Sequence, residues 1–384
     1  MNTATPKLAK DVDTRIRLEM LGTRRAKIQR LLIVRNDRIG DLMLTLPAIE
    51  MARRGFSSAH VAVLVAAENV PLLENNPHID EIVPDSGSDS PRELGAKLRS
   101  GNYDAAVVIN SNSRNCLAVW HAAIPHRVCW AYKPAGFIFG NRLVRLHRNR
   151  PPIHEAEFAS AFVKQLGVSA DLSDCRPELA ISKKTINAVR CRIVAELGSK
   201  GPLFGVHPGN KKSAYNWPPH RYAQLVRCLA KRGRVMISGA PHEAQLLEQV
   251  TDKLPFELQP RVATFSDFTL PELVAAISLQ DVLTISSTGP MHMAGVLGTP
   301  TAALFSGHRA HLPEKWAPLG DRHLILLAPL KHGEKNLPTH QGSEYMSRIS
   351  VDEVVEANRI CLDKWPRERS QADASYRTFR RWAC

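Results

Sequence analysis

The residues from His207 to Pro219 combine small side chains, amides and two lysines, which are the groups that bind a phosphate or pyrophosphate. Backbone amides can hold such an anion, and ammonium groups can neutralise its charge. The candidate binding residues of this segment are His207, Pro208, Gly209, Lys211, Lys212, Ser213, Asn216 and Trp217. A long turn in which Trp217 fills the protein core is the alternative interpretation.

A second segment gathers hydroxyl groups and a histidine where a helix is expected to begin, a position at which backbone amides favour an anion. Its candidate residues are Ser287, Thr288, Gly289 and His292. His292 lies close enough to the helix start to donate to a phosphate, although a single histidine is more often structural.

Two further segments place a carboxylate at an expected helix start. Gly239 and Glu243 follow one apolar run, and the carboxylate of Glu243 suits the hydroxyl pair of a ribose. Compensation of the helix dipole explains Glu243 equally well. Gly40 and Asp41 follow another apolar run, where Asp41 occupies a position typical of a helix cap. That segment lacks the G-x-G-x-x-G pattern of a dinucleotide site.

These segments interrupt an alternation of short apolar runs and amphipathic stretches, which is typical of parallel sheets with crossover helices. The predicted strands cover residues 31–34, 60–65, 79–83, 103–109, 127–130, 203–206, 234–237, 282–285 and 301–305. The principal predicted helices cover 41–53, 154–166, 185–197, 219–231, 242–253 and 290–297. The sequence therefore predicts an α/β protein with two doubly wound, Rossmann-like halves, whose ligands lie at the carboxyl ends of the strands.

The length of 384 residues also favours two domains, because it exceeds what one hydrophobic core usually serves. We expect a basic N-terminal extension over 1–29, a first domain over 30–180 and a second over 181–345. A C-terminal helix and basic tail should occupy 346–384. Either basic end could be a solvated helix or frayed tail, or could contact a membrane surface.

The sequence carries 51 Lys and Arg against 37 Asp and Glu, a formal net charge of +14. This excess favours anionic partners such as nucleic acid, acidic lipids or phosphorylated sugars, with solubility as the simpler explanation. The 7 cysteines are scattered without a C-x-x-C pair, which argues for reduced thiols and against a zinc site. We expect a cytoplasmic protein, because the sequence shows neither a long apolar run nor a signal peptide.

Taken together, these segments resemble glycosyltransferase family 9, the heptosyltransferase family. The motifs that carry the resemblance are Asp37-Arg38-Ile39-Gly40-Asp41-Leu42, Thr45-Leu46-Pro47, His207-Pro208-Gly209, Asn216-Trp217-Pro218, Gly239-Ala240 with Glu243, and Ser287-Thr288-Gly289-Pro290-Met291-His292. A final helix at 346–355 also fits the family, and the similarity extends over residues 31–362.

The resemblance implies a GT-B fold, in which an N-terminal acceptor domain and a C-terminal nucleotide-sugar domain face a central crevice. It implies inverting transfer, most often of heptose from ADP-heptose, to an anionic glycolipid acceptor of the lipopolysaccharide core. Asp41 matches the general base, and Arg38 and Gly40 become candidate substrate-binding residues. No metal is needed if lysines and helix amides absorb the charge that develops on the leaving diphosphate, and we expect no cofactor. Tyr215 and Ser287 stand where well-studied members carry lysine and aspartate, which bears on donor choice.

Two other function classes compete with a transferase. A nucleotide-sugar epimerase or hydrolase could use the same fold, and its products would differ when no acceptor is supplied. A nucleic-acid-binding protein could use the positive charge, but the sequence lacks a helix-turn-helix, zinc or aromatic RNA-binding signature. We therefore expect contact with an anionic membrane surface at the cytoplasmic face, and no nucleic-acid partner.

Overall fold

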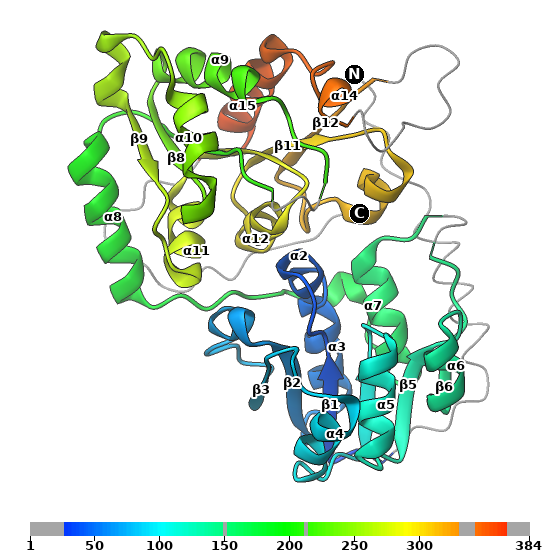
Figure 1. Ribbon diagram of the computed structural model, residues 1–384. Coiled ribbons are helices and arrows are strands. Elements are labelled where there is room, and N and C mark those ends of the chain that lie inside the picture. The colour runs from blue at the N-terminus through cyan, green and yellow to red at the C-terminus, as the bar shows by residue number, and fades with distance from the viewer. Residues whose placement is uncertain (1–26, 149–151, 211–213, 330–341, 367–384) are drawn as a thin grey trace. The chain divides into compact units, whose positions relative to one another are not determined.

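The protein forms two compact units that divide between Glu178 and Leu179. The computed structural model describes residues 27–148, 152–210, 214–329 and 342–366 (Figure 1). The predictions for Lys211, Lys212 and Ser213 lie outside the described residues, as do most of the basic N-terminal extension and the basic tail. The expectations attached to them therefore stay predictions.

The first unit contains a six-stranded sheet in which every strand runs parallel to its neighbours. The strands are β1 (Arg30–Val34), β2 (His60–Ala66), β3 (Glu81–Asp85), β4 (Ala105–Val108), β5 (His126–Trp130) and β6 (Arg142–Val144), in the spatial order β3-β2-β1-β4-β5-β6. The helices are α2 (Ile39–Met43), α3 (Leu46–Gly55), α4 (Pro91–Arg99), α5 (Ser113–His121), α6 (Pro134–Phe139) and α7 (Glu155–Lys164).

The second unit repeats this architecture with its own parallel sheet of six strands. Its strands are β7 (Leu203–His207), β8 (Arg234–Ser238), β9 (Val262–Phe265), β10 (Val282–Ser286), β11 (Thr301–Phe305) and β12 (His323–Leu327). Its helices are α8 (Lys183–Leu197), α9 (Pro219–Ala230), α10 (Ala244–Thr251), α11 (Leu270–Leu279), α12 (Gly289–Leu297), α13 (Pro313–Trp316), α14 (Gly342–Met346) and α15 (Val351–Lys364).

The two sheets share one topology, because the order β12-β11-β10-β7-β8-β9 is the first sheet's order read from the other edge. In each unit the first strand pairs with the second on one side and the fourth on the other. The strand order reverses at that point, and ligands of doubly wound sheets bind there, outside the carboxyl ends of the strands. The predicted fold class of two Rossmann-like α/β halves is confirmed.

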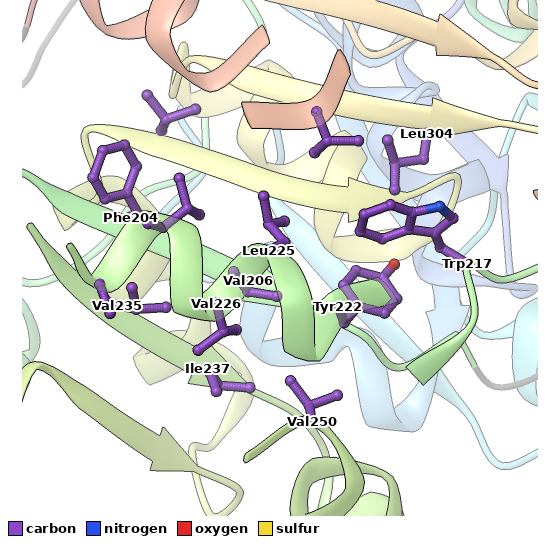
Figure 2. Packing of buried hydrophobic residues seen from close by; sticks show 14 of the residues in the cluster. Phe204, Val206, Trp217, Tyr222, Leu225, Val226, Val235, Ile237, Val250 and Leu304 are labelled. Carbon is purple, nitrogen blue, oxygen red and sulfur yellow. The ribbon is translucent and has the colours of Figure 1, made fainter. Parts of the chain in front are cut away.

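One hydrophobic cluster of the second unit forms where α9, α10 and α15 cover its sheet, and Figure 2 shows part of this cluster. Trp217 and Tyr222 lie in this core with no exposed surface, and their rings meet edge to face at 5.1 Å. The indole Nε1 of Trp217 donates to the carbonyl of Ile349 at 3.0 Å, so this buried donor is paired. Trp217 is therefore a core residue, and its assignment as a ligand contact was wrong.

Two predicted helices need correction. The single helix expected over 41–53 is divided into α2 and α3, and Pro47 lies in the first turn of α3. Proline supplies no amide hydrogen, so it suits a new helix start and not the interior of a continuous helix. The final helix expected at 346–355 begins only at Val351, where Ser350 and Glu353 form a reciprocal capping box.

Candidate active site

The loop after β1 is organised by one buried arginine. The side chain of Arg35 is 3% exposed, and its Nη2 donates to Asp41 Oδ1 at 2.6 Å and to Glu155 Oε1 at 2.8 Å. Its Nε lies 3.2 Å from Asp37 Oδ1. A second guanidinium, from Arg148, also pairs with Glu155. Three carboxylates therefore meet two guanidiniums at the carboxyl end of β1.

The unequal charges perturb the titration of this cluster. Burial raises the pKa of Asp37 to about 6; Arg35 opposes this shift, and the carboxylates of Asp41 and Glu155 add to it. Burial alone would lower the pKa of Arg35, but its three carboxylate neighbours outweigh burial and raise it above its ordinary value. The surplus carboxylate thus retains a proton more readily than an exposed aspartate does.

Asp41 is not the helix cap that its sequence position suggested. The cap of α2 is the extended residue Arg38, without a side-chain hydrogen bond, and Asp41 lies inside the first turn. The Asp41 side chain is 17% exposed, and Oδ1 is held by Arg35. Arg38 is exposed and Gly40 partly exposed at the same helix start. Asp41 therefore does not cap α2 with its side chain, although an acidic residue in the first turn still favours the helix dipole. Its carboxylate remains open to a chemical role.

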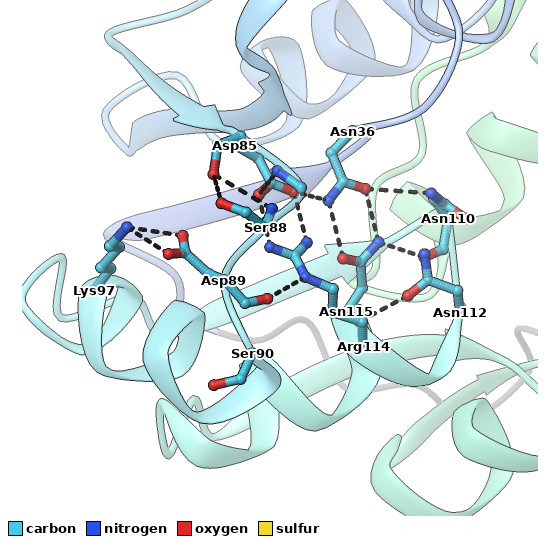
Figure 3. Close-up of polar contacts among 12 residues, drawn as sticks. Asn36, Asp85, Ser88, Asp89, Ser90, Lys97, Asn110, Asn112, Arg114 and Asn115 are labelled. Atoms are coloured by element: carbon cyan, nitrogen blue, oxygen red, sulfur yellow. Dashed lines mark hydrogen bonds and ion pairs between the residues drawn. The ribbon is translucent and has the colours of Figure 1, made fainter.

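A polar network joins three strand ends of the first unit, as Figure 3 shows. Asn36, which follows β1, donates to Asp85 at the end of β3 and to Asn115 Oδ1 at 2.9 Å. Asn110, which follows β4, donates to Asn36 Oδ1 at 3.2 Å. Arg114 anchors the far side through two bonds of 2.7 Å to the Asp85 carboxylate. The network fixes the loop that carries Arg35 and Asp41.

Burial alone would raise the pKa of the Asp85 carboxyl. The bonds from Arg114, the Gly87 amide and Asn36 outweigh burial and leave that pKa below its ordinary value. Asp85 is therefore an ionised anchor of the network, in contrast to Asp37.

In the second unit, the loops after β7 and β8 converge on His207, Gly209 and Glu243. His207 Nδ1 lies 2.9 Å from Ser238 Oγ. Burial lowers the pKa of His207 to about 4, with Glu243 opposing the shift, so the ring is neutral at physiological pH. A Cβ added to Gly209 would lie 2.1 Å from Glu243 Oε2, so only glycine permits this approach. The same Oε2 accepts from the amide of Ala240 at 2.9 Å.

Asn216 links the loop after β7 to the end of β10. Its Nδ2 donates to the carbonyl of Pro208 at 2.5 Å, and its Oδ1 accepts from Ser286 Oγ at 2.9 Å and from Tyr222 Oη at 3.2 Å. The Asn216 side chain is thus used within the protein, where it shapes the loop. We now assign it a positioning role in place of the predicted direct contact.

The start of α12 offers hydroxyl and amide groups. Thr288 precedes the helix in an extended conformation, and its buried Oγ1 has no hydrogen-bond partner within the described part of the chain. Gly289 and Pro290 form the first turn, Ser287 is partly exposed and His292 is 4% exposed. A buried hydroxyl without a partner is uncommon, and a ligand oxygen at the helix start would satisfy it.

Sequence analysis missed Arg35, Asn36, Asp85 and Glu155 as parts of the site. Among residues 27–148, 152–210, 214–329 and 342–366, no group of three or more His, Cys, Asp and Glu side chains is placed to hold a metal. The six cysteines that the structure describes are all free.

A family model for glycosyltransferase family 9 (heptosyltransferase) matches residues 92–342. The chain belongs to this family. A putative glycosyltransferase of Haemophilus influenzae is 25% identical over 84% of this family 9 chain and 96% of its own length. Lipopolysaccharide heptosyltransferase 2 of Escherichia coli is 25% identical over 72% of this chain and 82% of its own.

The fold comparison agrees with the family assignment. The solved structure of the E. coli ADP-heptose lipopolysaccharide heptosyltransferase II superposes with a TM-score of 0.73 at 23% identity, covering 87% of this chain and 99% of that one. The family 9 chain therefore has the GT-B fold and is a glycosyltransferase of the heptosyltransferase type.

Proposed function

We propose that this glycosyltransferase moves a sugar, with heptose from ADP-heptose as the favoured case, onto a lipopolysaccharide core or related glycan. Transfer inverts the anomeric carbon and uses neither a metal nor a cofactor. The observation that carries this proposal is the Asp41 carboxylate, which Arg35 holds by Oδ1 at 2.6 Å where the strand order reverses. Such a position suits a proton acceptor that must face a substrate.

Binding of the donor is assigned to the second unit. Glu243, held beside Gly209, suits the hydroxyl pair of the ribose. The start of α12, with Thr288 and His292, suits the diphosphate because the Thr288 hydroxyl and the backbone amides of a helix start can donate hydrogen bonds to an anion. Lys211 and Lys212 are proposed to neutralise the same diphosphate.

The chemical step is a single displacement. The acceptor hydroxyl attacks the anomeric carbon and forms the new C–O bond while the bond to the diphosphate breaks. Asp41 takes the hydroxyl proton through Oδ2, since no donor in the described part of the chain contacts that oxygen. The nucleoside diphosphate leaves with its electron pair, and donors at the start of α12 stabilise the charge that develops on it.

The acceptor is proposed to be an anionic glycolipid, with Arg38 among its contacts, and nucleic acid is not a partner. None of the helices that the structure describes is long and apolar enough to cross a membrane. We place the reaction at the cytoplasmic face of the inner membrane, where a peripheral enzyme can reach such an acceptor.

Asp41→Asn tests the base directly. The substitution preserves the size of the side chain but removes its proton affinity, so turnover should fall by about a hundredfold to ten-thousandfold. Affinity for ADP should be unchanged, because the nucleotide is assigned to the second unit. Asp80→Asn is the matched control, since Asp80 also pairs with an arginine, Arg53, but lies before β3 at the opposite end of the sheet.

The assay should follow ADP release from ADP-heptose by the folded variants, with and without acceptor, and identify the glycan product by mass spectrometry. Turnover of Asp41→Asn close to that of Asp80→Asn would remove Asp41 as the base. ADP release that is independent of acceptor would identify a hydrolase instead of a transferase.

A further inference from the structure

The short helix α6 buries its smallest residues and exposes two of its large apolar ones. Ala135 and Gly136 are buried, whereas the side chains of Phe137 and Ile138 are 63% and 67% exposed. A Cβ on Gly136 would lie 2.3 Å from the carbonyl oxygen of Trp130, so this face must pack against β5. The helix is therefore held in place while two adjacent large apolar side chains face the solvent, although such side chains are usually buried.

The exposed apolar surface continues onto α5. Trp120, near the end of α5, is 49% exposed, and its ring lies 5.8 Å from that of Phe139. We call Trp120, Phe137 and Ile138 the α6 patch. Clustered exposed apolar residues, unlike scattered ones, usually indicate a surface that is covered in function.

The chain segment that carries the α6 patch has charged side chains of one sign. Residues 105–154 contain seven Lys and Arg and no Asp or Glu. Several of these cations are engaged inside the protein: Arg114 pairs with Asp85, and Arg148 with Glu155. Lys133, which directly precedes α6, and Arg145, which follows β6, are exposed and have no ion pair within the described part of the chain.

Interfacial aromatic rings complete this surface. Tyr132 is 47% exposed and stacks on His147, with ring centroids 4.0 Å apart. Tryptophan and tyrosine prefer the boundary between headgroups and acyl chains, because each carries an apolar ring and a polar group. Apolar side chains flanked by interfacial aromatics and unpaired cations match the layers of an anionic leaflet.

We propose that the α6 patch docks the first unit onto an anionic phospholipid leaflet, with Phe137 and Ile138 inserted at the acyl-chain boundary and Lys133 and Arg145 at the lipid phosphates. The inference deepens the proposed function and rests on it, since a lipid-borne acceptor requires an enzyme held at the membrane. The patch consists of other residues than the basic chain ends considered from the sequence.

Vesicle binding by the full-length protein tests the proposal. The probe is a vesicle of phosphatidylethanolamine and phosphatidylglycerol that contains no glycolipid. The Phe137→Ser/Ile138→Ser double variant should bind at least about tenfold more weakly than the unmodified protein, because it lacks the inserted apolar surface. Phe256→Ser is the matched control, since Phe256 is 85% exposed in the second unit, and it should bind normally.

Separate variants test the contribution of the two cations to vesicle binding. Lys133→Gln and Arg145→Gln should each weaken binding about fivefold at low salt, and neutral phosphatidylcholine vesicles should bind the unmodified protein less well than anionic ones. Unchanged binding by the double apolar variant would overturn the proposal. A dimer of the unmodified protein that the same variant dissociates in sedimentation would also overturn it, by showing that a second copy covers the patch.

Activity separates this inference from the proposed function. The double apolar variant should lose transfer to a vesicle-borne glycolipid but retain transfer to the deacylated, water-soluble form of that acceptor. If the unmodified protein binds vesicles through the α6 patch yet transfers sugar to neither acceptor, the proposed function fails and the docking surface stands. Equal transfer by the variant to both acceptors would refute the docking role.

Discussion

Replacing Asp37 by asparagine should stabilise the first unit at neutral pH, although the substitution removes an ion pair. Asp37 lies 3.2 Å from Arg35, but that guanidinium also serves Asp41 and Glu155. With Arg148 included, three carboxylates meet two guanidiniums, so one carboxylate is in excess. Asparagine keeps an oxygen atom near Arg35 and removes the surplus negative charge.

The magnitude and sign follow from the pKa of Asp37. Its rise from an ordinary 3.8 to about 6 means that the folded state binds this proton more tightly than the unfolded state. The group therefore favours folding at low pH and loses that advantage as pH rises from about 4 through about 6. The difference between the two pKa values means that ionised Asp37 lowers the free energy of unfolding by about 3 kcal/mol above pH 6. Allowance for the 27% exposure of the side chain reduces this figure to about 2 kcal/mol.

Hydrogen exchange of the β1 and β4 amides measures this effect, because it reports unfolding of the first unit separately from the second. Asp37→Asn should raise the free energy of exchange by about 2 kcal/mol at pH 7 and change it little near pH 4. Equal or lower stability at pH 7, with the pH dependence of the unmodified protein retained, would refute the charge-surplus argument.

Two further predictions concern the second unit. His207→Gln should weaken the loss of stability on acidification: the pKa of about 4 keeps His207 neutral when folded, so its contribution is complete above pH 6.5 and is lost as pH falls toward 4. Compared with its effect at pH 7, the substitution should make the free energy of exchange of the β7 amides about 2 kcal/mol higher at pH 5. A variant whose stability falls with acidification as steeply as that of the unmodified protein would contradict this prediction. Gly209→Ala should lower ADP affinity about tenfold or more in calorimetry, because its Cβ would collide with Glu243 at 2.1 Å; normal affinity would remove Glu243 from the ribose site.

The central strands of both sheets were predictable and several edge strands were not. Strands β1, β7, β10 and β11 are buried along nearly their whole length and read as continuous apolar runs. Strands β6, β9 and β12 are partly exposed, carry mixed side chains and escaped prediction. Each of these strands lies at the edge of its sheet and has a neighbouring strand on one side only. Fewer of its side chains must therefore be apolar, so it lacks the continuous apolar run by which a strand is predicted.

The site shows a similar division between local and distant information. The glycines and hydroxyls at strand ends were visible because turn and helix-start chemistry leaves a local pattern. The partnership of Arg35 with Glu155 joins residues 120 positions apart, and the helix pattern around Glu155 does not reveal which buried group its carboxylate meets. Trp217 misled because a tryptophan beside a phosphate-type loop has the same local sequence whether it contacts ligand or core.

The two units use one topology for opposite electrostatic tasks. At the strand-order reversal of the first unit, the charges are paired with one carboxylate in excess, and Arg35 holds the Asp41 carboxylate that we propose as the proton acceptor. At the corresponding point of the second unit, the carboxylate of Glu243 lies beside neutral groups: an imidazole with a lowered pKa, a hydroxyl for which the structure describes no partner, and a helix start. Neutral donors suit an incoming diphosphate because no buried counter-charge must be displaced. We propose that Asp37 and Arg35 tune the proton transfer in the first unit, whereas separate groups in the second unit bind the diphosphate.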